Sequence, residues 1–232
     1  TQHPLFTDFW QATLAKLETN LGSPLAAEGE GAARVRAVSE VMQSHAFAYP
    51  LTGDERHAAR ALEGLEIIRN EPCAWNFIEH NEMYPQDTAD LMTAEITKSC
   101  ANTVSWLWPL LADGQRAEYL AMIAERGGQA IYSGATAGCW WGNALNSNWT
   151  AVLNSGLAFA ALAQKLGTDP NFQRAATDRE TPGGKLGSVP SFNDWLAFAR
   201  ARTLEMLDLA AEEGAGVEGT GYWLYCFGSL QD

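Results

Sequence analysis

WWGNALNSNWTAVLNSG, residues 140–156, stands at the start of an alanine-rich helical pattern. It holds three tryptophans and four asparagines in seventeen residues. Asparagine is unfavourable inside a helix, and each buried amide needs partners for its donors and its acceptor lone pairs. Ser147 or Asn148 is expected to cap the helix, which explains one or two of the amides. Asn143 and Asn146 remain unexplained, and this excess of amides at a helix N-terminus predicts a place for a carboxylate or a sugar.

The helix that follows carries an apolar stripe, and the same periodicity recurs along most of the chain. The stripe runs from Trp149 to Ala160 and is expected to be core, with Asn154 bonded to a neighbouring loop. Apolar residues also recur at helical spacing within 9–17, 35–42 and 58–68, and further helices are predicted at about 88–111, 114–132, 149–166 and 191–211. Strand-like alternation is nearly absent, so the sequence predicts an all-α architecture.

A weak internal similarity between two segments suggests how these helices are arranged. AFAYPLTGDERHAARAL (46–62) and AFAALAQKLGTDPNFQRA (158–175) each pass from a small-residue helix through a turn into a second helix. Gly53 and Gly167 are expected to end the first helix in the left-handed conformation, and the Thr/Asp pair beside each glycine to cap the second. Antiparallel helical hairpins of this kind build toroids and solenoids.

Composition and charge limit the class of function. The 232 residues are 47% hydrophobic and 19% charged, which is typical of a folded chain, and we treat 1–232 as one domain with a long loop at 176–190. The formal net charge of −13 disfavours nucleic acid and anionic membranes as partners. No apolar run is long enough for a membrane span. The four cysteines are widely spaced, so that one disulfide or free buried thiols are both compatible with the sequence.

The common catalytic and cofactor motifs are absent or out of context. Gly214, Gly216 and Gly219 match GxGxxG, but they follow a predicted helix where a dinucleotide fold needs a strand. No Walker A, HExxH or GxSxG motif occurs. No two histidines share a helical turn, and we predict neither a metal site nor a cofactor. His57 is expected on an exposed polar helix face, whereas His80, in the irregular segment 75–87, is a candidate site residue or a structural histidine.

Two tyrosines near the end of the sequence are further candidates. Tyr222 and Tyr225, in GTGYWLYCFG, would share one face if a helix begins near residue 221. A tyrosine can act as a general acid or base when its surroundings stabilise the phenolate. The pattern alone is also compatible with a core position for both rings.

Taken together, three segments resemble one family. LTGDERHAARAL (51–62), WWGNALNSNWTAVLNSGLAFAAL (140–162) and EGTGYWLYCFG (218–228) occur in this order. From about residue 3 onward the chain is similar to the N-terminal α/α-toroid domain of the heparinase II/III-like polysaccharide lyases and their alginate-lyase relatives. The resemblance implies an incomplete α/α toroid, truncated before a C-terminal β-sandwich domain that would be its partner. It also implies a periplasmic or secreted protein, or a cytoplasmic one if the substrate is an oligosaccharide.

The resemblance implies β-elimination on a uronic-acid-containing glycan. Asn146 or Asn148 would neutralise the uronate carboxylate, and Tyr222, or alternatively Tyr225, would serve as acid and base. Family members often carry histidine directly after the neutralising asparagine, whereas Ser147 and Trp149 occupy those positions here. The residues expected to bind the acidic polysaccharide are His80, Trp140, Trp141, Asn143 and Trp149. The alternatives are a uronyl C5-epimerase, which shares the proton abstraction, and a non-catalytic carbohydrate-binding toroid.

Overall fold

The structure is a computed structural model that describes residues 4–25, 29–76, 88–168 and 192–213. All regular elements in these ranges are helical, so the predicted all-α class is confirmed. The α-helices are α1 (Pro4–Leu21), α2 (Gly31–Thr52), α3 (Glu55–Asn70), α4 (Leu91–Leu107), α5 (Asp113–Ile123), α6 (Gln129–Thr136), α7 (Trp140–Asn143), α8 (Asn148–Gly167) and α10 (Phe192–Glu213). A short 3-10 helix, η1 (Trp108–Leu110), follows α4, and a π-helical turn, η2 (Ala124–Gly128), joins α5 to α6.

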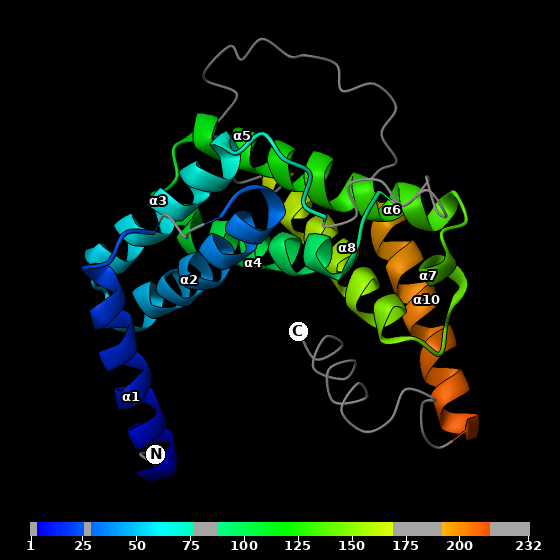
Figure 1. Ribbon diagram of the computed structural model, residues 1–232, viewed down its shortest axis with the longest axis horizontal. Helices are drawn as coiled ribbons and strands as arrows, with labels where there is room; N and C mark the ends of the chain where they lie inside the picture. Colours follow the sequence, from blue (N-terminus) through cyan, green and yellow to red (C-terminus); the bar gives the residue numbers. More distant parts are fainter. Residues whose placement is uncertain (1–3, 26–28, 77–87, 169–191, 214–232) are drawn as a thin grey trace.

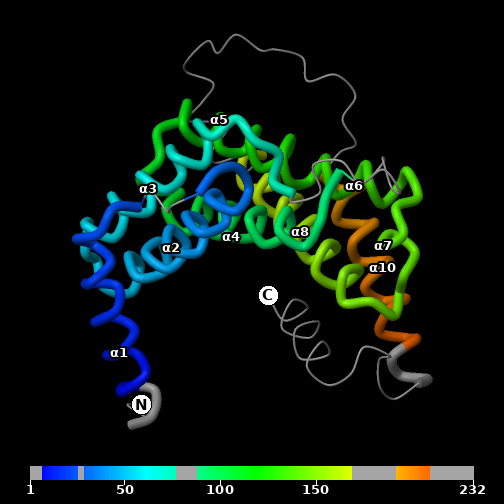
Figure 2. Tube along the Cα trace, viewed as in Figure 1, coloured from blue at the N-terminus to red at the C-terminus, as the bar shows by residue number. Residues whose placement is uncertain are grey.

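The described helices form an arch (Figure 1). α2, α4 and α8 pack side by side in that order, with α3 against α2 and α10 against α8. The continuous segment α5–η2–α6 lies across α4 and α8. Figure 2 shows α1 and α10 at the two ends of the arch, both extending to the same side. Within the described ranges the helices do not close into a ring, and none of them is long and apolar enough to cross a membrane.

Helix boundaries follow local chemistry where the sequence predicted them. Gly53 ends α2 with φ of 70°, and the side chain of Asp54 caps α3 by accepting a hydrogen bond from the Arg56 amide. The parallel prediction for Gly167 is wrong, because Gly167 is the last residue of α8 and does not have a positive φ. A Cβ at Gly167 would lie 2.7 Å from Leu120 Cδ1, so a larger residue there would require the end of the Leu120 side chain to move.

Close approaches between helices set the position of α8. A Cβ at Gly156 would lie 2.7 Å from Ala94 Cβ and 2.8 Å from Ala94 Cα, so α8 meets α4 at a glycine. In η2, a Cβ would overlap Thr97 of α4 at Gly127 and the Trp195 ring of α10 at Gly128. Small residues therefore allow α8 to approach the backbone of α4 and allow η2 to pack against side chains of α4 and α10.

One buried cluster of apolar side chains fills the space between these helices. Its largest fully buried members are Trp75, Trp141, Trp195, Tyr119, Met42, Leu65, Ile68, Ile96, Leu107, Ile123, Ile131 and Leu153. The predicted stripe on α8 belongs to this core, because Val152, Leu153, Leu157 and Ala160 are fully buried. Cys73, Cys100 and Cys139 form no disulfide with one another.

Candidate functional site

The N-terminus of α8 is the centre of the amide-rich stretch. Ser147 is the N-cap, since its hydroxyl accepts a hydrogen bond from the Trp149 amide at 3.3 Å. Asn148 is the first helical residue and is only 5% exposed. Of the two capping residues that the sequence left open, the structure therefore has Ser147 in that role.

Two side chains attach the short helix α7 to its neighbours. Thr150 Oγ1 lies 2.8 Å from the Trp141 carbonyl oxygen and 2.6 Å from that of Ala144, and can donate its proton to either. Arg202 of α10 donates through Nη2 to the Gly142 carbonyl, and the same atom lies 3.2 Å from Asn143 Oδ1. The loop from α7 to α8 is thus held from both sides.

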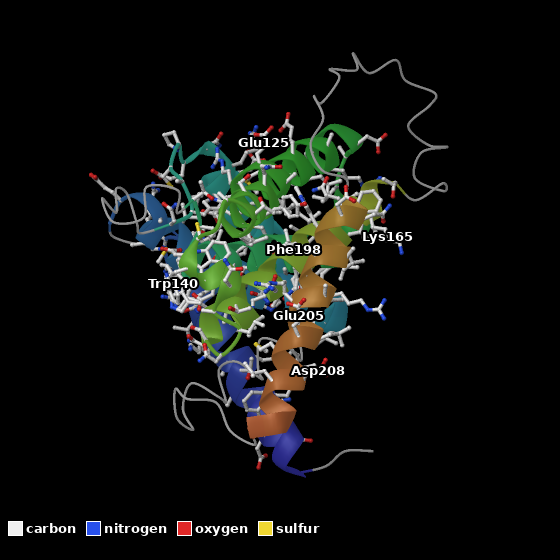
Figure 3. All side chains as sticks on the ribbon, turned by 90° about the vertical axis from the view of Figure 1, so that its right-hand side faces the viewer. Glu125, Trp140, Lys165, Phe198, Glu205 and Asp208 are labelled. Atoms are coloured by element: carbon white, nitrogen blue, oxygen red, sulfur yellow. The ribbon has the colours of Figure 1, made fainter. Side chains whose placement is uncertain are left out.

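Four residues of the amide-rich stretch are exposed or half-buried, and we call Trp140, Asn143, Asn146 and Trp149 the junction face. Trp140 is 37% exposed, and its ring centroid lies 5.0 Å from that of the half-buried Trp149. Asn143 and Asn146 are both exposed. Figure 3 views the arch from the end that carries α7 and α10, with Trp140 of α7 and Glu205 of α10 labelled.

The junction face combines two asparagine amides, which can form hydrogen bonds, with two indole rings. Because Asn143 Oδ1 accepts from Arg202, the amide NH2 of Asn143 is the end that can donate to a ligand. The side chain of Asn146 makes no hydrogen bond with any described residue, so both ends of its amide can serve a ligand. Arg202 also pairs with Glu205 at 2.7 Å, which leaves little net positive charge behind the amides.

Trp141 and Asn154 lie inward from this face. Trp141 is 2% exposed and packs on Gly134, so a glycan could reach this indole only if the core opened. Asn154 donates to the Thr150 carbonyl of its own helix at 2.7 Å. The expectation that Asn154 bonds a neighbouring loop is therefore wrong, because an acceptor one helical turn away within α8 is closer.

Three predicted site residues lie outside the described ranges. His80 belongs to 77–87, and Tyr222 and Tyr225 belong to 214–232. Their assignments stay predictions. The sequence did not identify Arg202 as a site residue. It showed only a cationic residue within the helix predicted at 191–211, and the contact of Arg202 with Asn143 spans 59 residues.

The expectation for His57 is wrong. His57 is 1% exposed, and its Nδ1 lies 2.9 Å from Nδ1 of His45, which is fully buried on α2. Burial lowers the pKa of His45 to about 4, with smaller contributions from His57 and Arg60. The helical pattern placed His57 on a polar face, but α1 and α2 pack over that face in the tertiary structure.

Charged groups surround this histidine pair. Arg56 forms hydrogen bonds with both Asp54 and Glu18, and its hydrogen bond to Asp54 lowers the pKa of that carboxyl to about 2. One ligand atom from each of Glu18, Asp54 and His57 lies within 4.8 Å of the other two. Both carboxylates of this group pair with Arg56, and the spacing is one at which three side chains could share a cation.

A hollow of about 600 Å³ lies between α4 and α8. Its lining is mainly apolar and includes Ala101, Phe159, Leu162, Ala163 and Leu166. Lys165 is the only charged residue among the described residues that line it. The described residues that line the hollow therefore include no paired acid and base of the kind that catalysis of proton transfer would need.

The chain was compared with known families and with curated proteins. No family model and no curated protein matches it.

Proposed function

We propose that this chain is the helical domain of a polysaccharide lyase that cleaves an acidic glycan by β-elimination, and that the junction face binds the glycan. The observation that carries the proposal is the exposed Trp140 ring paired with Trp149, together with the two exposed asparagines that lie between them in the sequence. Sugars present apolar ring faces that stack on indoles, and their hydroxyl and carboxylate groups need amide partners. The sequence resemblance contributes the reaction type, the toroid architecture and an extracytoplasmic location.

Asn146 is the better candidate for the group that neutralises the uronate carboxylate. Its exposed amide can donate to a carboxylate oxygen, whereas Asn148 is 5% exposed at the start of α8. Neutralisation stabilises the negative charge that develops as the C5 proton leaves. Asn143, held through its oxygen by Arg202, supplies a second amide donor.

The elimination then needs one proton removed and one supplied. Tyr222, or Tyr225 in its place, would take the C5 proton as phenolate. The C5–H electrons form the C4–C5 double bond, the C4–O bond breaks, and the departing oxygen takes a proton from a tyrosine. An unsaturated uronate and a new chain end are the products.

Two other functions fit the same face. A C5-epimerase would remove the same proton and return one from the opposite side without breaking the chain. A non-catalytic glycan-binding domain would use the indoles and amides alone. We favour the lyase because both tyrosines occur in the EGTGYWLYCFG segment that carries the resemblance.

The direct test incubates the full-length protein with alginate, heparan sulfate and other uronate polymers and follows the ultraviolet absorbance of the unsaturated product, because the chain by itself is expected to be inactive or weakly active. Product formation is expected for at least one polymer. Deuterium incorporation from solvent without chain cleavage would instead establish an epimerase. Glycan binding with neither reaction would indicate a non-catalytic glycan-binding domain. A folded protein with no binding and no turnover would refute the proposal.

Variants then test the junction face. Asn146→Ala is expected to lower kcat/KM by about 100- to 1000-fold, the usual loss of one transition-state hydrogen-bond donor. Trp140→Ala is expected chiefly to raise KM, because stacking is made in ground and transition state alike. Asn70→Ala is a matched control, since Asn70 is also an exposed asparagine but ends α3. Equal effects of Asn146→Ala and Asn70→Ala would show that the site lies elsewhere.

A further inference from the structure

A cluster at the opposite end of the arch has a chemistry that the proposed function does not use. Glu18 lies on α1, Asp54 caps α3 and His57 lies in the first turn of α3. Their ligand atoms lie within 4.8 Å of one another. A tetrahedral zinc ion with bonds of about 2.1 Å holds neighbouring ligand atoms about 3.4 Å apart. The ligand atoms would therefore need to approach one another by little more than about 1 Å to bind zinc.

The histidine distinguishes this cluster from an ordinary surface ion pair. His57 is 1% exposed, and its only side-chain hydrogen bond within the described part of the chain joins its Nδ1 to Nδ1 of His45. If His57 donates from Nδ1, its Nε2 carries the lone pair that a metal requires. A hydrogen bond from the second ring nitrogen fixes the tautomer and orientation of metal-binding histidines in this way. One ring nitrogen of this buried imidazole lies within 4.8 Å of a carboxylate oxygen from each of Glu18 and Asp54, and this points to a cation.

Arg56 occupies the carboxylate side of the cluster. Its guanidinium lies 2.8 Å from Glu18 Oε1 and also bonds both oxygens of Asp54. The Arg56 side chain is 62% exposed, so it can leave the carboxylates without disturbing the core. The guanidinium thus compensates the two negative charges and would compete with a metal ion for them.

We propose that Glu18, Asp54 and His57 form a zinc-binding site in which His45 positions His57 and Arg56 is a built-in competitor. The mixed nitrogen and oxygen donor set suits zinc and disfavours magnesium, which prefers oxygen ligands throughout. Because Glu18 belongs to α1 and the other two ligands belong to the start of α3, bound zinc would fasten α1 to the α2–α3 hairpin. This proposal is independent of the lyase reaction.

The test is a titration of the metal-free protein with Zn²⁺ alone by calorimetry, with Co²⁺ absorption as a report on nitrogen and oxygen ligation. One zinc per chain is expected. Glu18→Gln, on an exposed side chain, is expected to weaken binding at least tenfold, and Asp54→Asn should do the same while keeping a good helix cap. Arg56→Gln is expected to tighten binding at least tenfold, because it removes the competitor. Zinc should also raise the melting temperature of the Arg56→Gln protein.

The chain offers a matched control. Arg69 bridges two carboxylates in the same manner, at 2.6 Å from Glu66 and 3.0 Å from Glu118, and within the described ranges no histidine joins this pair in a metal-binding group. Arg69→Gln therefore uncovers two carboxylates without an imidazole and should not improve zinc binding. The proposal is overturned if the wild-type protein binds no zinc, or if Arg56→Gln binds zinc no more tightly than the wild-type and Arg69→Gln proteins do. It is equally overturned if Glu18→Gln and Asp54→Asn leave the zinc affinity of Arg56→Gln unchanged.

Discussion

The close approach of α4 and α8 makes Gly156→Ala the sharpest test of the fold. The new Cβ would lie 2.7 Å from Ala94 Cβ, 2.8 Å from Ala94 Cα and 3.2 Å from Ile131 Cδ1. Ala94 Cα is backbone and cannot rotate away, so the two helices must separate. Overpacking of this kind costs about 1–3 kcal/mol, and the rigid neighbour favours the upper end of that range. Alanine regains about 1 kcal/mol of helix propensity, which leaves a net loss of about 2 kcal/mol.

The assay is urea unfolding followed by circular dichroism, together with thermal melting. For a chain of this size, a loss of about 2 kcal/mol lowers the melting temperature by about 4–8 °C. Gly114→Ala is the matched control, because Gly114 lies in the first turn of α5 and a Cβ added there would have no atom within 4 Å. It should gain up to about 1 kcal/mol from helix propensity. If Gly156→Ala is as stable as Gly114→Ala, the close approach of α4 and α8 is refuted.

A double-mutant cycle locates the clash. Ala94→Gly removes the atom nearest to the new Cβ, so it should relieve part of the cost of Gly156→Ala. We expect a coupling free energy of about 1 kcal/mol, since the backbone at position 94 would still crowd the new methyl group. Strict additivity of the two substitutions would mean that the two positions do not meet.

Three further predictions concern polar groups. The pKa of His45 is lowered to about 4 by folding, so its contribution to the free energy of unfolding is complete above about pH 6.5. About 3 kcal/mol of that free energy is lost as the pH falls from 6.5 towards 4. Urea unfolding in EDTA should therefore show a smaller loss of stability at acid pH for His45→Gln than for the wild type. Arg126→Met should lose about 2–3 kcal/mol in the same assay at pH 7, because the guanidinium donates to three carbonyl groups at the end of α3. Tyr119→Phe should lower the free energy of unfolding by about 1 kcal/mol, since the Tyr119 hydroxyl donates to Glu66 at 2.5 Å. The same hydrogen bond lowers the pKa of Glu66, so NMR titration should show a higher pKa for Glu66 in the variant.

Local pattern was sufficient for much of the secondary structure. The predicted helices at 149–166 and 191–211 correspond to α8 and α10, because apolar residues at helical spacing must share one buried face. The end of α2 at Gly53 and the cap at Asp54 also followed from residue type. These features depend on interactions within a few residues, which a sequence displays directly.

The candidate sites depended on distance in space, which the sequence does not display. The asparagine excess identified the junction, but only packing showed that Asn143 and Asn146 are exposed while Trp141 and Asn148 are buried. Local spacing could not show that Arg202 reaches Asn143.

The amino-acid sequence by itself determined an acidic, all-helical chain with an amide-rich entry to α8. Only the tertiary structure decided that the polar face holding His57 is covered by α1 and α2, because helical periodicity reports which residues share a face and not what packs against it. Glu18, His45 and His57 come from three different helices, and no spacing rule within one segment could have joined them.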